Sequence, residues 1–413
     1  MTTGNTPNDA IAWLRSPAAI RQRCGEMLTL AEAGALDHFA IDPSRLSVAA
    51  DKVVEVIRAD YPTLDIPYHS RWRHFDLDGI DRWRQLAAGL AGTDAEELAR
   101  IRIDLAVSSV LLDAGAGAAW RYDEAATGNS YQRSEGLAVA SFDLFVAGGF
   151  SSQPDAPLRA DAAALEGFNE TALATAFQVR DDNPLVGLTG RAALMQGLGG
   201  ALRQCPEIFG AEAPRIGNLF DHLAGQTENG RLPATAILAA VLQGLEPIWP
   251  GRIRLDGVNL GDVWPHPKIG GDGPAAGLVP LHKLSQWLTY SLVEPLEDAG
   301  IAVTDLEALT GLAEYRNGGL MVDTGLLASK HDAVLNEPHE AGSAVIVEWR
   351  ALTVALLDRV ADAVRERLGL DADALPLPKV LQGGTWSAGR RLARERRAGG
   401  EPPITLSSDG TVF

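Results

Sequence analysis

Apolar side chains recur at helical spacing along most of the chain, three or four residues apart. This pattern predicts mostly helical structure in residues 10–60 and helices at 96–114, 133–152 and 342–369. Ser343 is a candidate N-cap for the last of these, because a serine side chain can accept a hydrogen bond from the first turn. We therefore predict a mainly α, multi-helical fold with few short strands.

The pattern changes between Trp249 and Pro280, where glycine and proline become frequent and long alternation is absent. We predict a loop-rich rim over a site here, which would present Asp262 and Trp264. A plain surface loop is the alternative. Pro280 suits the first turn of a following helix, which would carry Lys283.

A second irregular segment, residues 66–79, reads IPYHSRWRHFDLDG. It gathers two histidines, three aromatic residues, two arginines and two aspartates. Loops with such side chains often carry function, so Tyr68, His69 and Trp72 are candidate site residues. Alternatively, the aromatic side chains of this segment simply fill the core.

The segment LTGLAEYRNGG, residues 309–319, places Glu314 beside Tyr315 and Arg316. Upstream, Thr304 and Glu307 form a T-x-x-E capping box, which predicts a helix that starts near Asp305. The Asn-Gly-Gly turn at 317–319 should end that helix. Glu314 would then lie near a helix C-terminus, where the helix dipole raises the pKa of a carboxyl group. A carboxylate at this position would be explained either by an exposed ion pair with Arg316 or by a catalytic site.

Length and composition narrow the possible classes of protein. The 413 residues suffice for a large core, and we divide them into an N-terminal helical segment at 1–100, a helical middle region at 101–245 and a C-terminal region at 246–413, expected to form one compact unit. The formal net charge of −18 makes nucleic acid an improbable partner. No apolar run is long enough for a membrane span, and the few cysteines suit a reducing cytosol, so we expect a soluble cytoplasmic protein.

Several common motifs are absent from the sequence. There is no P-loop, no G-x-S-x-G and no H-E-x-x-H, and Pro338 makes metal binding by the histidines of residues 331–340 unfavourable. We therefore expect neither a metal nor a cofactor. Residues 383–391, which include Arg390, could form an anion-binding loop that enters a helix, or else an arginine-rich helix surface.

Long motifs connect the chain to a known family. It resembles the uracil-catabolism (URC pathway) family of fungi and bacteria over nearly its whole length. The motifs that carry this resemblance are IPYHSRWRHF, LLDAGAGAAWRYDE, RSEGLAVASFDLF, FQVRDDNPLVGLTGRAAL and the ending GGTWSAGRRLA…SDGTVF.

The C-terminal third also looks similar to the queuosine-salvage nucleosidases, which cleave the N-glycosidic bond of queuosine 5′-phosphate. Their signature elements appear in order, as LGD at 260–262, HKLSQ at 282–286, LAEYR at 312–316 and IVEWR at 346–350. This resemblance implies a DNA-glycosylase-like helical core. The catalytic aspartate of that family is Glu314 here, and the Gly-rich loop before Lys283 looks longer, which implies a different leaving group.

Together the two resemblances imply a reaction. The pathway implies a uracil ring that is opened while still attached to ribose, so an enzyme must then cut ribose from urea. We predict that this chain hydrolyses the N-glycosidic bond of ribosylurea or its 5′-phosphate, a small-molecule ribosyl substrate. A non-catalytic pathway partner that carries an intermediate, and an amidohydrolase that acts on a ring-opened pyrimidine, are the alternatives.

The resemblance also implies roles for particular residues. Glu314 would stabilise or attack the anomeric carbon, and Asp262 would hold ribose hydroxyls or urea nitrogens. The cations that would bind a phosphate are Lys283, Arg316 and Arg390. The residues that would hold the site in position are Glu348 and Arg350, on the predicted helix at 342–369. The aromatic residues that would bind substrate and exclude water are Tyr68, His69, Trp72, Trp264 and Tyr315.

Overall fold

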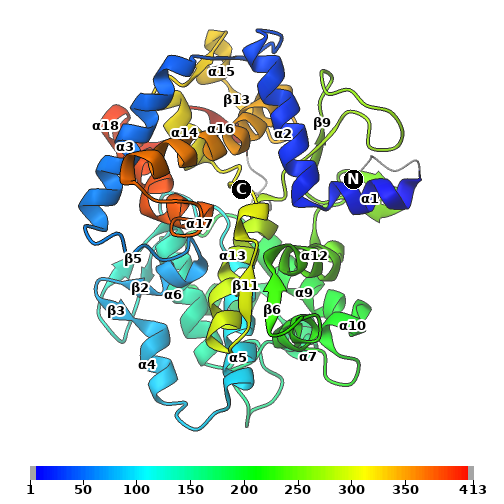
Figure 1. Ribbon diagram of the computed structural model, residues 1–413. Coiled ribbons are helices and arrows are strands. Elements are labelled where there is room, and N and C mark those ends of the chain that lie inside the picture. Colours follow the sequence, from blue (N-terminus) through cyan, green and yellow to red (C-terminus); the bar gives the residue numbers. More distant parts are fainter. Residues whose placement is uncertain (1–5, 408–413) are drawn as a thin grey trace. The chain divides into compact units, whose positions relative to one another are not determined.

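The computed structural model describes residues 6–407 and confirms a mainly α fold (Figure 1). Helices carry most of the chain, and the strands are short and paired in twos. The last six residues of the quoted family motif, 408–413, lie outside the described residues. Among the helices of residues 6–407, none is long and apolar enough to cross a membrane.

The chain divides into two compact units. Unit 1 comprises the described residues up to His69, Gly251–Gln286 and the described residues from Asp305 on, and unit 2 comprises Ser70–Pro250 and Trp287–Thr304. Unit 1 therefore unites the start of the chain with most of the C-terminal region. The expectation that the three sequence segments form one compact unit stays a prediction.

Unit 1 holds the elements that carry most of the candidate site residues. They are α1 (Pro7–Leu14), α2 (Pro17–Glu32), β1 (Phe39–Ile41), α3 (Leu46–Asp60), β7 (Arg254–Leu255), β8 (Val258–Asn259), β9 (Val263–Pro265), β10 (Leu278–Pro280), the start of α13 (Lys283–Asp298), α14 (Tyr315–Asp323), β12 (Leu327–Ser329), α15 (Asp332–Asn336), β13 (Pro338–Glu340), α16 (Ala344–Leu368), α17 (Leu377–Val380), a π-helical turn (Leu381–Thr385), α18 (Trp386–Arg396) and β14 (Thr405–Ser407).

Unit 2 is built mainly from helices. Its elements are β2 (Asp76–Leu77), β3 (Ile80–Asp81), α4 (Arg82–Ala88), α5 (Ala95–Leu111), β4 (Tyr122–Asp123), β5 (Ser130–Tyr131), α6 (Arg133–Val146), α7 (Ala162–Gly167), α8 (Glu170–Ala176), α9 (Leu188–Gln204), α10 (Pro206–Phe209), α11 (Leu219–Ala224), β6 (Arg231–Pro233), α12 (Ala234–Gly244), the rest of α13 and β11 (Ala302–Thr304). The helices predicted at 96–114 and 133–152 are thus confirmed as α5 and α6.

The long helix α16 is the centre of unit 1. It packs against α2, α3 and α14 (Figure 1). Most of its apolar residues are buried. The Ser343 side chain accepts from the Ile346 N–H at 3.4 Å, and Gly369 ends the helix in a left-handed conformation. This confirms the predicted helix together with its cap.

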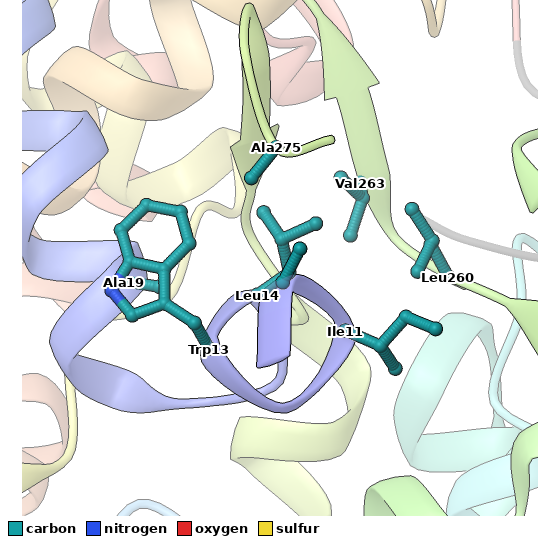
Figure 2. Packing of buried hydrophobic residues seen from close by; sticks show 8 residues of the cluster. Ile11, Trp13, Leu14, Ala19, Leu260, Val263 and Ala275 are labelled. Carbon is teal, nitrogen blue, oxygen red and sulfur yellow. The ribbon is translucent and has the colours of Figure 1, made fainter. Parts of the chain in front are cut away.

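The glycine- and proline-rich segment forms short antiparallel pairs, β7 with β8 and β9 with β10. The prediction for Pro280 was wrong, because Pro280 ends β10 and α13 begins three residues later at Lys283. Behind β9, a core cluster joins α1 to this segment (Figure 2). Its members are Ala10, Ile11, Trp13, Leu14, Ala19, Leu260, Val263 and Ala275. Burial of these side chains holds the β7–β10 segment, and Asp262 within it, against the N-terminal helices.

Candidate active site

Glu314 is the N-cap of α14, which corrects the helix predicted from Asp305. Its Oε1 accepts from the Arg316 N–H at 2.6 Å and its Oε2 from the Asn317 N–H at 3.0 Å. Residues 306–308 form only a 3-10 turn. Glu314 therefore lies at the positive end of a helix dipole, which stabilises a carboxylate, and not at the negative end.

The Asn-Gly-Gly sequence does not end a helix, because it lies inside α14. A Cβ on Gly318 would lie 2.7 Å from the Trp349 ring on α16, so the glycine allows the two helices to pack closely. A Cβ on Gly389 of α18 would collide with the Arg316 carbonyl oxygen. Helix packing, and not a turn, accounts for these glycines.

The carboxyl group of Glu314 is enclosed but reachable. Its residue is of intermediate exposure. Burial raises the pKa of Glu314, while the two main-chain N–H groups and the charges of Lys283 and Arg316 counteract part of that rise. The predicted direction was right but the cause was wrong, since desolvation and not a helix C-terminus raises this pKa. A carboxylate has about four acceptor sites, and in the described chain Glu314 uses two of them.

Asp262 has all of its acceptor sites occupied. Its Oδ1 accepts from Arg350 at 2.8 Å and from the Trp264 indole at 2.6 Å, and its Oδ2 accepts from Arg350 at 2.8 Å and from the Lys283 N–H at 2.9 Å. Burial disfavours the ionised form, but the Arg350 charge and these hydrogen bonds outweigh it and hold the pKa of Asp262 well below its usual range. A substrate hydroxyl would have to displace one of these donors, so the geometry suits a positioning group.

Arg350 connects the two carboxylates. Its two Nη atoms bind Asp262, and its Nε donates to the carbonyl oxygen of Ala313 at 3.3 Å. Ala313 directly precedes Glu314 in the chain. Lys283 starts α13 beside Asp262, and its charge acts on Glu314. The structure thus brings together four residues that the sequence analysis selected from four separate motifs.

The predicted partners Glu348 and Trp264 lie in the same unit. The Oε1 of Glu348 is 3.4 Å from Nε2 of His266, both side chains are buried, and its Oε2 accepts from the His38 N–H at 3.2 Å. Trp264 donates to Asp262 and so helps to fix that carboxylate. Glu348 therefore lies two residues before Arg350 on α16 and ties this helix to the segment after α2.

Tyr315 and Arg316 form the first turn of α14. The Arg316 guanidinium lies 4.8 Å from the centre of the Tyr315 ring, and its Nη1 donates to the Gly400 carbonyl oxygen at 2.7 Å. Arg316 is buried, whereas 42% of the Tyr315 surface is exposed. Tyr315 is therefore an accessible aromatic surface beside Glu314.

A second group of predicted residues lies near the π-helical turn. His69 shares a hydrogen bond of 3.0 Å with Gln382, and burial lowers the pKa of His69 to about 4. Its ring centre is 6.1 Å from that of Trp386, on which the Arg390 guanidinium also packs at 5.2 Å. Tyr68 packs close by under Lys379 at 5.5 Å. Gln382 and Trp386 had no predicted role, although the motif GGTWSAGR contains Trp386.

One hydrogen bond ties this second group to α14: the Thr385 hydroxyl donates to Asn317 Oδ1 at 2.9 Å. Of the two alternatives for residues 383–391, the structure supports the arginine-rich helix and not the loop, because residues 381–396 are a π-helical turn followed by α18. Gly384 packs closely against α3, where a Cβ would be too near Val53, and Gly383 packs against Ile66 in the segment that follows α3. A π-helical turn is often found at functional sites.

Trp72 belongs to unit 2. Its indole donates to the Ser291 carbonyl oxygen at 2.8 Å, and Arg102 lies 4.3 Å from the ring centre. Its role in substrate binding stays a prediction. Within residues 6–407, no group of three or more His, Cys, Asp or Glu residues is arranged to hold a metal ion.

Comparisons with known proteins cover almost the whole chain. The model of the family described as "Protein of unknown function (DUF1688)" matches residues 13–413. Protein urg3 of Schizosaccharomyces pombe is 39% identical over 98% of this chain and 99% of its own length. Uracil catabolism protein 4 of Lachancea kluyveri is 37% identical over 99% of this chain and 100% of its own length. The chain therefore belongs to the DUF1688 family, and to the same uracil-catabolism family as these two relatives.

Proposed function

We propose that this protein acts in uracil catabolism and hydrolyses the N-glycosidic bond of a ribosylurea-type intermediate, releasing urea and the sugar. The name of the Lachancea kluyveri relative supports the pathway. The bond to be cut follows from the resemblance of four motifs to nucleosidases. The observation that carries the proposal is the meeting of those motifs around Glu314, through Arg350 and Lys283.

The chemistry needs a carboxylate near the anomeric carbon. Cleavage of an N-glycoside passes through a state with positive charge on the sugar ring, and a carboxylate stabilises that charge or attacks the carbon. Glu314 has two acceptor sites that no described residue uses, and Lys283 and the helix N-terminus favour its ionised form. In the balanced reaction, the C–N bond breaks, the hydroxyl of water joins the sugar carbon and a proton joins the departing urea nitrogen.

The residues around Glu314 hold its carboxylate in place. The Asp262–Arg350 pair holds the main chain immediately before Glu314 through the Ala313 carbonyl oxygen. Catalysis depends on such placement, because small errors in the position of a charged group cost large factors in rate. Tyr315, exposed beside Glu314, offers an aromatic face to the sugar or its leaving group.

The test is a product assay with the purified full chain. Ribosylurea and its 5′-phosphate are each incubated with the protein, free sugar is followed by proton NMR, and urea is measured in parallel. We expect free ribose or ribose 5-phosphate together with an equal amount of urea. Ammonia without free sugar would show that another bond is cut, and no turnover of either compound by folded protein would contradict the proposal.

A further inference from the structure

A pocket of about 400 Å³ lies at the end of α18. One continuous stretch of chain, residues 394–400, lines it, and three of these residues are arginines. Its volume is in the range of small-ligand sites. Residues 390–397 contain five arginines and one glutamate, on a chain whose formal net charge is −18. In the structure Asp60 pairs with Arg391 and Asp323 with Arg397, yet the arginines of this segment still outnumber the carboxylates around it, and such a local excess of positive charge attracts anions.

The charged side chains around the pocket differ in whether another side chain already binds them. Arg397 binds the Asp323 carboxylate with two hydrogen bonds, of 2.8 and 2.6 Å. The carboxylate of Glu395 is 3.7 Å from Lys52, which offsets its charge. Arg396 is exposed and makes no hydrogen bond or ion pair with any residue that the structure describes. Its guanidinium is therefore available to a ligand.

Glycine gives the pocket its shape. Gly399 and Gly400 both have left-handed backbones, with φ of 78° and 66°, a conformation that glycine adopts at little cost. A Cβ on Gly400 would lie 2.9 Å from Cγ of Arg394. The main chain can therefore fold back close to the Arg394 side chain, which forms the wall of the pocket.

The pocket is attached to the helix turn that carries Glu314. Arg316 Nη1 donates to the Gly400 carbonyl oxygen at 2.7 Å, and Arg316 is two residues after Glu314. Only 6% of Arg316 is exposed, and its Nε has no hydrogen-bond partner among residues 6–407. The pocket and the candidate catalytic carboxylate are thus held by neighbouring residues of one helix.

We propose that the pocket at residues 394–400 binds the phosphate group of a sugar phosphate, with Arg396 as its main ligand, so that the substrate is the 5′-phosphate form. A guanidinium can donate two parallel hydrogen bonds to phosphate oxygens, which an ammonium group cannot match. The claim that the bound phosphate belongs to the substrate rests on the proposed function, whereas the claim that the pocket binds an anion does not. The proposal moves the phosphate site away from Lys283, which lies beside Asp262, and from Arg390, which packs on Trp386.

The first experiment measures binding without turnover. Calorimetric titrations of the full chain with inorganic phosphate and with ribose 5-phosphate are compared for the wild type, Arg396→Gln and Arg359→Gln. Arg359 is an exposed arginine of α16 whose ion pair is with Glu32, so its variant makes the same change in net charge elsewhere. We expect Arg396→Gln to weaken binding at least about tenfold, Arg396→Lys to fall between it and the wild type, and Arg359→Gln to bind normally.

Two results would overturn the proposal. One is the absence of saturable binding of either probe to the wild type, and the other is equal affinity in Arg396→Gln and the wild type. Where the protein turns over both ribosylurea compounds, Arg396→Gln should raise KM for the 5′-phosphate alone. An unchanged KM would refute the assignment to the substrate. Failure of the proposed reaction would leave the binding result intact, so the two failures are distinguishable.

Discussion

Asp262 and Glu314 are two carboxylates of the same unit that are stabilised in opposite ways. Asp262 accepts four hydrogen bonds, two of them from one arginine, and its pKa is held below the usual range. Glu314 accepts two, both from the main chain of its own helix, and burial raises its pKa. Asp262 has every acceptor site occupied by another residue, whereas Glu314 keeps acceptor sites that a ligand could use.

This difference assigns different work to the two residues. A group with every acceptor site occupied holds a structure in place, whereas a carboxylate with open sites and a raised pKa is typical of a reacting group. Arg350 joins them, since it binds Asp262 and also the carbonyl oxygen before Glu314. We therefore propose Asp262 as a positioning residue and Glu314 as the catalytic one.

The largest expected effect comes from removing the shared arginine. Arg350→Met would leave the Asp262 charge buried without its partner, so the free energy of unfolding should fall by about 3 to 5 kcal/mol. Urea unfolding measures this, with Arg359→Met on the same helix as the control. Arg359 is exposed and paired with Glu32, so that variant should lose no more than about 1 kcal/mol. Equal losses in the two variants would show that Asp262 does not depend on Arg350.

A smaller effect distinguishes the two carboxylates by pH. The folded pKa of Asp262 lies below its unfolded value, so its stabilisation is present above the unfolded pKa and is lost as pH falls. The folded pKa of Glu314 is raised, so its stabilisation is present below the unfolded pKa and is lost as pH rises through the folded pKa. Asp262→Asn should therefore cost most at neutral pH, whereas the stability of Glu314→Gln relative to wild type should increase as pH rises above the unfolded pKa of glutamate.

Urea unfolding curves for both variants, recorded from about pH 2 to about pH 7, check the two signs, because the Asp262 contribution changes below the unfolded pKa of aspartate and the Glu314 contribution changes above that of glutamate. If the change in unfolding free energy had the same sign of pH dependence in both variants, the proposed distinction between Asp262 as positioning residue and Glu314 as catalytic residue would be contradicted.

The smallest effect concerns the cap of α14. Glu314→Ala removes the acceptor for the Arg316 and Asn317 N–H groups and should cost about 1 kcal/mol of stability, whereas Glu314→Gln keeps an acceptor oxygen and should cost less. Thermal unfolding of the two variants measures the difference. If the alanine variant were as stable as wild type, Glu314 would not be contributing as a cap.

The sequence alone predicted regular helices better than it predicted the surroundings of Glu314. The apolar periodicity and Ser343 were enough to predict α16, because its buried face and its cap are both local signals. Around Glu314 the local signals were misleading. Glutamate is a less usual N-cap, and Gly318 is required by the ring of Trp349, a residue 31 positions later in the chain.

The site residues were chosen by resemblance, and their contacts could not have been derived from spacing. The bond from Arg350 to Asp262 spans 88 positions, and its bond to Ala313 spans 37. Such pairs form only when helices and short strands from distant parts of the chain pack together. The role of Gly383 in packing against Ile66 was hidden for the same reason.

Turnover by Glu314→Gln tests the central claim most directly. The variant is assayed with ribosylurea and its 5′-phosphate by NMR, beside wild type and a Glu340→Gln control on the exposed strand β13. Removing an electrostatic stabiliser should cost about 3 to 4 kcal/mol of barrier, so we expect turnover to fall about 10² to 10³-fold while the folded protein stays stable. Near-normal turnover by folded Glu314→Gln would remove Glu314 from the mechanism and contradict the account.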